Sequence, residues 1–538
     1  MTHVKIYDTT LRDGTQREGI SLSLADKIRI THLLDELGVA YIEGGWPGSN
    51  PKDAAYFDDV QTITLKHAKI AAFGSTCRKD TDPADDANIK ALVDANTPVV
   101  TVVGKTSMLH VTDVLQTTPE ENLRMIRESL AYLKLLGKEV IYDAEHFFDG
   151  AKLDMEYAFD TLKAAIEGGA DTVVLCDTNG GSMPWEIADY VRQVRSVFGD
   201  DIEIGIHTHN DGELAVANSL AAVNDGATHV QGTINGYGER CGNANLCSII
   251  PDLILKMNVD CLPDRSQLRR LTHLSRTVAE IANLAPDSHL AYVGKSAFAH
   301  KGGIHVAAIR RNVDSYQHIT PEDVGNEMRV LVSDLSGRGN VLSKAEELGL
   351  DVSKNEAVQV LEEIKELENE GFVFEGAEAS IAIRLHRAKP DYEPIFRLID
   401  FTTITEDRRG RGHLAEAMVK LDVEGDVVHT AAEGNGPVNA LDMALRKALV
   451  ATYPDIADFQ LVDYKVRILD GDSATAATTR VLIDTQMGSK RWSTVGAGTD
   501  IIRASWLALI DSVEYGLCIA LSEDETIANT VEEVAIGD

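Results

Sequence analysis

The chain has 538 residues, which is too long for a single hydrophobic core and predicts about two to four domains. Hydrophobic residues make up 44% and charged residues 25%, as in an ordinary globular protein. The net charge of −34 excludes a nucleic-acid backbone as partner. No apolar run is long enough for a membrane span, and the N-terminus lacks a signal-peptide core, so we expect a cytoplasmic protein.

The six cysteines show no Cys-x-x-Cys spacing, and most stand beside apolar residues. This pattern favours buried, reduced thiols over disulfides or a zinc cluster. The cysteines are Cys77, Cys176, Cys241, Cys247, Cys261 and Cys518.

Strand-like and helix-like segments alternate over the first 260 residues. Strands are expected at 4–7, 41–43, 69–73, 99–103, 139–142, 172–175, 202–206 and 229–234. Helical patterns lie between them, as at 25–37, 120–136, 157–167 and 213–225, and several end at a glycine. Eight such pairs predict a (β/α)₈ TIM barrel over residues 1–262. A doubly wound sheet is the alternative, but no Gly-x-Gly-x-x-Gly follows the first strand.

The rest of the chain is expected to form three further parts. These are a helical lid segment at 263–330, a linker subdomain at 331–390 with a helix at 354–370, and a C-terminal α+β domain at 391–538. In the last part strands are expected at 415–423, 463–469 and 478–484.

The C-terminal domain contains an internal sequence repeat. Gly434-x-Gly436 precedes a helical pattern at 438–449, and Gly496-x-Gly498 precedes another at 500–512. We infer a duplicated unit of roughly sixty residues. A glycine turn at a helix start could hold an anion, although tight chain packing is the commoner explanation.

Two distant motifs could build one metal site. His207 and His209 follow an apolar strand, and side chains two apart on a strand share a face. Asp13 comes just after the first strand, so the three side chains can converge in a barrel. One carboxylate and two imidazoles suit a divalent metal such as Mg²⁺, Mn²⁺ or Zn²⁺ with open positions for a ligand.

Other polar residues fall at the same ends of the expected strands, where a parallel barrel carries its functional groups. They are Arg12, Glu43, Glu145, Thr178 and Asn243. Each also has a structural reading: Arg12 could simply pair with Glu43, Thr178 could cap a helix, and Glu145 could be an ordinary acid. His300 and His305 lie beyond the barrel, where a histidine is more often a satisfied surface or core group.

Three motifs in this order resemble the DRE-TIM metallolyase superfamily: DTTLRDGTQ at 8–16, HTHND at 207–211 and GYGERCGN at 236–243. Within it the chain resembles the family of 2-isopropylmalate, homocitrate and citramalate synthases, because GNGPVNAL at 434–441 is similar to their regulatory domain. The segments EGGWPGSNPKD at 43–53 and GKTS at 104–107 are most similar to the citramalate synthase group.

The resemblance implies roles for individual residues. Asp13, His207 and His209 would bind the metal, with Asn243 as an additional ligand. Arg12 would donate hydrogen bonds to the oxygen of a 2-keto acid and Thr178 would bind its carboxylate, with Gln16 and Glu43 as further substrate-binding residues. Glu145 and His305, assisted by Tyr316, would remove a proton from acetyl-CoA; which of the two is the base stays open.

The reaction implied is the condensation of acetyl-CoA with pyruvate and water to give citramalate and CoA, in a homodimer that isoleucine inhibits. Isoleucine could meet a Gly-x-Gly turn, at Gly434 and Gly436 or at Gly496 and Gly498. The alternatives are 2-oxoisovalerate or 2-oxoglutarate as the acceptor, a lyase on the same barrel, and a non-catalytic sensor.

Overall fold

The computed structural model describes residues 3–408, 412–470 and 476–536. The chain divides into two compact units. The first contains residues 1–298 and 318–328, and the second contains 299–317 and 329–538. No helix in the described ranges is both long and apolar enough to cross a membrane.

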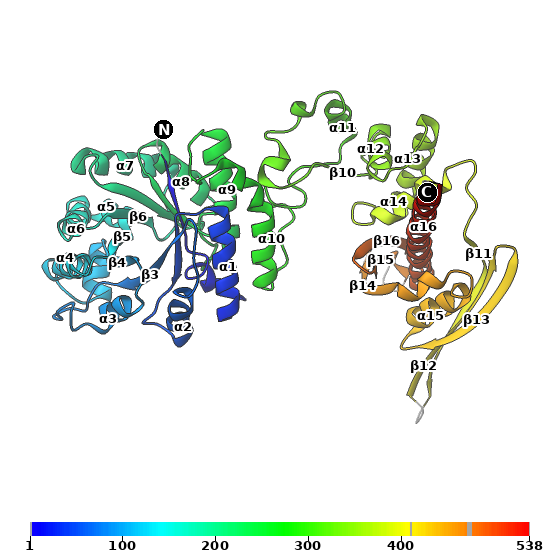
Figure 1. The fold of residues 1–538 in the computed structure, drawn as a ribbon, viewed down its shortest axis with the longest axis horizontal. Coiled ribbons are helices and arrows are strands. Elements are labelled where there is room, and N and C mark those ends of the chain that lie inside the picture. The colour runs from blue at the N-terminus through cyan, green and yellow to red at the C-terminus, as the bar shows by residue number, and fades with distance from the viewer. Residues whose placement is uncertain (1–2, 409–411, 471–475, 537–538) are drawn as a thin grey trace. The chain divides into compact units, whose positions relative to one another are not determined.

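The first unit is a closed barrel of eight parallel strands in sequence order, which confirms the predicted fold (Figure 1). Its strands are β1 (Lys5–Asp8), β2 (Tyr41–Gly45), β3 (Lys69–Ser75), β4 (Val99–Lys105), β5 (Glu139–Glu145), β6 (Thr172–Asp177), β7 (Glu203–Thr208) and β8 (His229–Gly232). The intervening helices are α1 (Leu24–Leu37), α2 (Pro51–Val60), α3 (Ala87–Asp94), α4 (Pro119–Leu135), α5 (Phe147–Leu153), α6 (Met155–Glu167), α7 (Pro184–Phe198) and α8 (Ala215–Asn224). Strand β1 pairs with β8 and closes the ring.

Local sequence signals set the helix ends. The Ser23 side chain accepts a hydrogen bond from the Asp26 amide and Asp26 returns one to the Ser23 amide, a capping box that begins α1. At its other end Gly38 takes a left-handed conformation (φ 92°), which a residue with a Cβ adopts at a cost.

The barrel interior is a separate apolar cluster, while a larger core lies between strands and helices. At the amino-terminal ends of the strands, the His229 ring lies 5.3 Å from the Tyr7 ring and 5.6 Å from the Tyr41 ring, measured between centroids. This end of the barrel is therefore filled by aromatic packing, which leaves the opposite end for polar groups.

The expected lid segment 263–330 is divided between the units. Its helix α10 (Leu271–Ile281) belongs to the barrel unit, as does helix α9 (Leu246–Pro251) just before the segment, whereas helix α11 (Gly303–Ile309) belongs to the second unit. Two short strands, β9 (Ala299–His300) and β10 (Arg329–Val330), pair with each other in the second unit.

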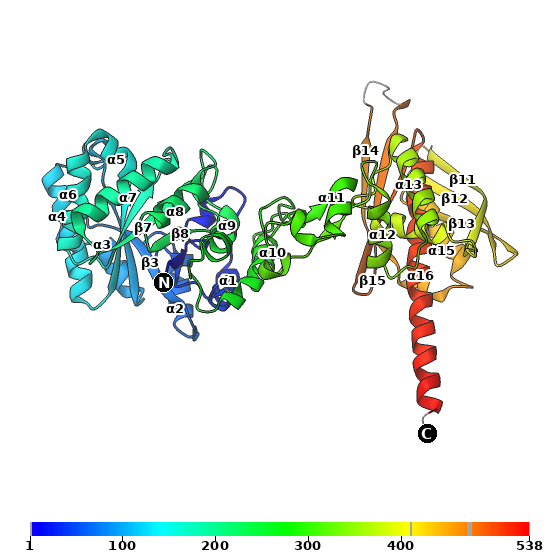
Figure 2. The ribbon, with the colours of Figure 1, turned by 90° about the horizontal axis from the view of Figure 1, so that it is seen from above.

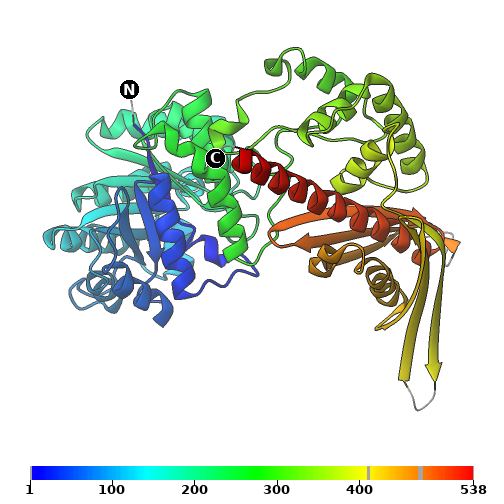
Figure 3. The same cartoon turned by 45° about the vertical axis from the view of Figure 1, so that its right-hand side comes forward.

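The second unit begins with helices and ends with two similar halves. The helices are α12 (Arg338–Glu347), α13 (Lys354–Asn369) and α14 (Glu378–Arg387). The first half has strands β11 (Phe396–Arg408), β12 (Gly412–Val423) and β13 (Asp426–Gly434), followed by helix α15 (Pro437–Leu449). The second half has strands β14 (Gln460–Ile468), β15 (Thr479–Met487) and β16 (Lys490–Gly498), followed by helix α16 (Ile501–Ile536) (Figure 3).

Each half is thus a three-stranded antiparallel sheet with a helix, so the predicted repeat is present. The two glycine motifs are not in phase, however. Strand β13 ends at Gly434 and β16 ends at Gly498, so Gly498 and not Gly496 corresponds to Gly434. The last helix also continues well beyond the predicted end at residue 512 (Figure 2).

Candidate metal centre and catalytic cavity

A cavity of about 680 Å³ opens at the carboxyl ends of the barrel strands. Seven of the residues singled out in the sequence line it: Arg12, Asp13, Gln16, Glu145, Thr178, His207 and His209. Glu43 and Asn243 are buried behind the cavity wall. The cavity size falls within the range of small-molecule sites in proteins.

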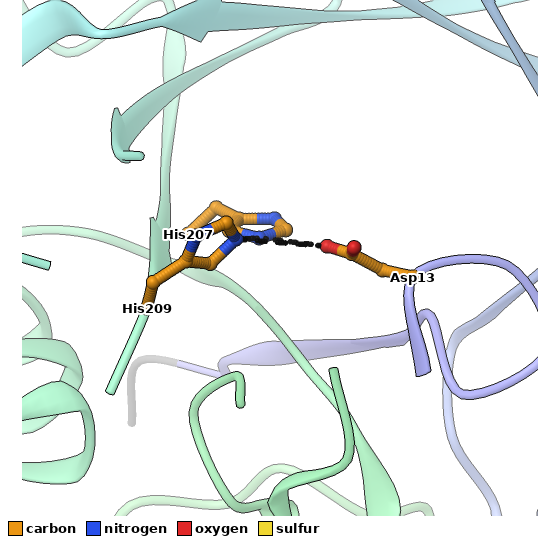
Figure 4. Close-up of side chains that lie close together, drawn as sticks. All are labelled: Asp13, His207 and His209. Atoms are coloured by element: carbon orange, nitrogen blue, oxygen red, sulfur yellow. Dashed lines mark hydrogen bonds and ion pairs between the residues drawn. The ribbon is translucent and has the colours of Figure 1, made fainter. Parts of the chain in front are cut away.

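Asp13, His207 and His209 converge within this cavity (Figure 4). The Asp13 Oδ2 atom lies 3.3 Å from His207 Nε2 and 3.7 Å from His209 Nε2. The two Nε2 atoms are 3.1 Å apart. One carboxylate oxygen and two ring nitrogens therefore face a common point.

Neighbouring groups fix the orientation of each histidine ring. Gln231 Nε2 donates to Asp143 at 3.0 Å, which turns Gln231 Oε1 toward His207 Nδ1 at 2.7 Å. His209 Nδ1 lies 2.8 Å from the carbonyl oxygen of Thr178. Because the Gln231 oxygen can only accept, His207 Nδ1 carries a proton and Nε2 faces the site. His209 Nδ1 lies between the Thr178 carbonyl and the Arg240 Nη2 donor at 2.9 Å, and its Nε2 also faces the site.

Asn243 adds a fourth acceptor. Its amide nitrogen donates to the Tyr237 carbonyl at 3.2 Å, so its Oδ1 atom points to His207 Nε2 at 3.0 Å. Without a metal, a proton on His207 Nε2 can lie between this nitrogen and Asp13 Oδ2, and a divalent cation at the same point would take the place of that proton. The donor set therefore fits a divalent metal, and Gln231 and the Thr178 carbonyl hold the two rings in place.

Buried charges explain the electrostatics of the same site. Burial opposes ionisation of Asp13, but the Arg12 guanidinium together with His207 and His209 outweighs it, and the pKa of Asp13 lies well below its usual range. Burial likewise opposes protonation of His207, yet Asp13 and Asp143 raise its pKa to about 9. The site thus stabilises positive charge, as a metal centre must.

Arg12 is held in a fixed orientation beside the metal ligands. Its Nε donates to Glu43 at 2.6 Å, and its Cζ lies 3.9 Å from the centroid of the Phe73 ring. The Trp46 ring meets Phe73 edge-on, with centroids 5.4 Å apart. Arg12 therefore retains guanidinium N–H groups for a ligand in the cavity, between an acid and an aromatic wall.

Glu145 and Thr178 meet partners that sequence reasoning did not single out. The Lys105 ammonium forms an ion pair with the Glu145 carboxylate. The His146 amide donates to Thr178 Oγ1 at 2.9 Å, which leaves the threonine hydroxyl proton for another acceptor. Lys105 could have been found from the sequence, because it is a polar residue at the carboxyl end of a strand. In the barrel it lies directly opposite Glu145 in the register of β4 and β5.

Several other cavity residues have weaker sequence signals. Arg240 donates to Asp211 at 2.7 Å and to the Thr178 carbonyl at 2.8 Å. Arg78 and Lys79 add two further cations to the lining. All three lie on loops, where neither strand nor helix periodicity marks a functional position.

His305 and Tyr316 belong to the second unit. Their rings stack with centroids 4.3 Å apart, and Tyr316 is 44% exposed. The two residues proposed to act together are therefore neighbours in space.

The four glycines proposed for an effector divide into two kinds. A Cβ at Gly434 would lie 2.5 Å from the Ala440 amide nitrogen, and one at Gly496 would lie 2.0 Å from the Ala504 carbonyl oxygen, so both allow close helix packing. Gly436 and Gly498 face open space. The amides that begin α16 are already satisfied by Asp500, which accepts from Ile502 and Arg503.

Three family models match consecutive parts of the chain. The HMGL-like model matches residues 3–278, the homocitrate synthase post-HMGL domain-like model matches 292–371, and the LeuA allosteric (dimerisation) domain matches 375–517. Fold, site and matches together define a barrel protein of the HMGL-like class that carries an allosteric domain.

Similarity to individual proteins extends over nearly the whole chain. An (R)-citramalate synthase of Geobacter sulfurreducens is 56% identical, with 96% of this chain and 98% of the relative covered. The (R)-citramalate synthases of Aquifex aeolicus and Synechocystis sp. are 51% and 50% identical, with coverage of 96% and 98% of this chain and 98% and 99% of the relatives. The chain belongs to the (R)-citramalate synthase family.

Proposed function

We propose that the protein condenses acetyl-CoA with pyruvate and hydrolyses the thioester to give (R)-citramalate and CoA. The observation that carries this proposal is identity of 50–56% over nearly the full length to three (R)-citramalate synthases. A probable 2-isopropylmalate synthase of Methanopyrus kandleri is 32% identical over 95% of the chain. Pyruvate is therefore preferred to 2-oxoisovalerate as the acceptor.

Asp13, His207, His209 and Asn243 would hold a divalent metal, Mg²⁺, Mn²⁺ or Zn²⁺. When bound, such a metal supplies Lewis-acid polarisation of a carbonyl group. Arg12 would donate to the keto oxygen on which negative charge develops during attack. Glu43 accepts from Arg12 and therefore acts by positioning the guanidinium.

The free proton of the Thr178 hydroxyl would bind the keto-acid carboxylate, with Gln16 at the same cavity. The space beside Arg12 is bounded by Phe73 and Trp46, which supports a small side chain on the keto acid. Removing either ring should admit a larger acceptor, such as 2-oxobutanoate.

Glu145 is the proposed base for the methyl proton of acetyl-CoA, since it lines the cavity and Lys105 holds its carboxylate in place. His305 and Tyr316 are proposed as catalytic residues from the family resemblance. Replacing His305 by alanine should reduce kcat while pyruvate binding is retained.

The LeuA allosteric (dimerisation) domain suggests a homodimer with an effector. We assign isoleucine to that effector, because citramalate is a precursor of its carbon skeleton. The start of α15, with Gly436 and no side-chain cap, is the better candidate for the effector carboxylate than the start of α16, where Asp500 occupies the amides. Catalytic activity that is unchanged by millimolar isoleucine would remove this assignment.

The decisive experiment supplies acetyl-CoA with pyruvate, 2-oxobutanoate, 2-oxoisovalerate or 2-oxoglutarate and follows thiol release with and without EDTA. We expect the fastest release with pyruvate, and loss of release with EDTA. The 2-oxoglutarate arm is needed because Arg78 and Lys79 provide cations that could meet a second carboxylate. No thiol release with any keto acid would overturn the proposed function. His207→Ala should abolish release without loss of fold.

A further inference from the structure

A second cavity of about 530 Å³ lies in the barrel unit, apart from the catalytic one. Helix α10, the loop after it and the loop after β8 form its walls. Six of its lining residues carry the argument: Arg17, Tyr237, Arg276, Leu290, Val293 and Lys295. None of these residues has a proposed role in the condensation reaction.

Three cations line this cavity without a carboxylate partner among the described residues. Arg17 lies over the Tyr237 ring, with its Cζ 5.2 Å from the centroid. The nearest polar contact of Arg276 is to the Asn326 amide oxygen at 3.5 Å, and Lys295 forms no ion pair in the described part of the chain. In a chain with a net charge of −34, such a group of unpaired cations is suited to an anion.

The cavity also holds one acid, Asp287, whose Oδ1 accepts a hydrogen bond from the His289 amide at 2.8 Å. The lining therefore has three cations and one carboxylate, and its net charge is positive. Leu290, Val293 and the Tyr237 ring supply an apolar wall next to the cations. A ligand that fits must therefore combine several negative charges with a flat apolar group.

The second cavity adjoins the catalytic cavity through two short stretches of chain. Arg17 directly follows Gln16, and Tyr237 is two residues before Glu239; Gln16 and Glu239 both line the catalytic cavity. The Tyr237 carbonyl accepts the hydrogen bond from the Asn243 amide that orients this proposed metal ligand. A ligand against the Tyr237 ring would therefore contact a residue that is hydrogen-bonded to the proposed metal ligand Asn243.

We propose that this cavity binds the phosphate-bearing end of an adenine nucleotide, with the phosphates on Arg17, Arg276 and Lys295 and the base on the apolar wall. Two sources share this chemistry: the nucleotide end of acetyl-CoA, which rests on the proposed function, and a free adenine nucleotide. The adenine ring and phosphates match the apolar and cationic halves of the lining.

The test measures calorimetric binding of adenosine 3′,5′-bisphosphate, ADP and adenosine to the full chain. We expect the phosphorylated probes to bind at least about tenfold more tightly than adenosine, and Arg276→Gln/Lys295→Gln to weaken them by about tenfold or more. The control Lys90→Gln/Arg192→Gln removes two exposed cations elsewhere on the barrel unit and should change nothing. Equal binding of all three probes, or unchanged binding in the Arg276/Lys295 variant, would overturn the proposal.

Competition separates the two sources. If acetyl-CoA supplies the ligand, it displaces the bisphosphate, and the Arg276/Lys295 variant raises the KM for acetyl-CoA while the kcat and the KM for pyruvate stay constant. If a free nucleotide is the ligand, acetyl-CoA does not displace it; either result supports the site. The binding experiment involves no turnover, so a failure of the proposed condensation would show as absent thiol release with nucleotide binding intact.

Discussion

Glu43 is a fully buried acid on which three donors from the end of β1 and the loop after it converge. Tyr7 donates to its Oε1 at 2.6 Å, and Arg12 and Thr9 both donate to its Oε2. Burying a carboxylate costs several kcal/mol unless it is paired in this way. These hydrogen bonds hold the Arg12 guanidinium rigid, as its proposed role at the reacting carbonyl requires.

Glu43→Gln tests this at the level of one residue. The amide is uncharged and has one acceptor oxygen in place of two, so Arg12 loses its ionic partner and gains freedom; we expect kcat to fall roughly 10–100-fold. The affinity for Mn²⁺, measured by calorimetry, should not change, because Glu43 is not a proposed ligand. Glu139→Gln makes the same change in a carboxylate that accepts from Tyr41 and Lys69, and should leave kcat unaffected. Equal losses in both variants would contradict the prediction.

His229 is a second buried residue with a measurable consequence. Neither ring nitrogen has a hydrogen-bond partner among the described residues, and burial lowers its pKa to about 4. The unfolded chain takes up this proton below about pH 6.5, while the folded chain does not until about pH 4. His229 therefore removes up to about 3 kcal/mol of stability as the pH falls through that window.

His229→Leu should accordingly reduce the acid sensitivity. The free energy of unfolding, measured in urea from pH 7 to pH 4, should fall less steeply in the variant than in the parent protein. The exposed His273 provides the matched control, and His273→Leu should follow the parent curve. Parallel curves for the His229 variant and the parent would contradict the low pKa.

At the level of elements, the sequence predicted the barrel because each strand carries a run of β-branched residues and both of its faces are buried. Strand β13 gave no comparable signal, since none of its residues is buried and the inward–outward alternation is missing. For the site, the sequence predicted which polar residues lie at the carboxyl ends of the strands. The orientations of the His207 and His209 rings depend on Gln231, Asp143 and the Thr178 carbonyl from other strands, and only the closed register brings these together.

Arg240 links the loops that follow three barrel strands. It contacts Asp211 after β7 and the Thr178 carbonyl after β6, from its own position after β8. Because that carbonyl and the Arg240 guanidinium both lie beside His209 Nδ1, Arg240→Met should loosen this proposed metal ligand and weaken Mn²⁺ binding by roughly 10–100-fold. Arg192→Met breaks exposed ion pairs to Asp189 and Asp225 and should bind Mn²⁺ as tightly as the parent. Unchanged Mn²⁺ affinity in the Arg240 variant would show that the loops hold His209 without it.

At the level of the whole molecule, the allosteric domain is fastened to the linker helices by a buried charge network. The Asp511 carboxylate on α16 pairs with Arg384 at 2.8 Å and with Arg387 at 3.0 Å, both on α14. Ser380 donates to the same carboxylate, and its hydroxyl accepts from the Val495 amide of β16. The Asp511 carboxylate thus connects α16 to α14 and, through Ser380, to β16, so we expect α16 and α14 to move together.

Asp511→Asn should uncouple these elements. It removes the carboxylate that Arg384 and Arg387 share, while their ion pairs with Glu363 and Glu514 remain, so we expect a cost of about 1–3 kcal/mol. Hydrogen exchange should then rise in α14 and in the first turns of α16, while the barrel strands and the rate of condensation without effector stay unchanged. The proposed inhibition by isoleucine should weaken, since α14 and α16 both contribute to the part of the chain that matches the allosteric domain. Arg397→Met breaks an exposed ion pair with Glu393 and serves as control. If exchange in α14 stays at the parent level, the network does not hold the two elements together.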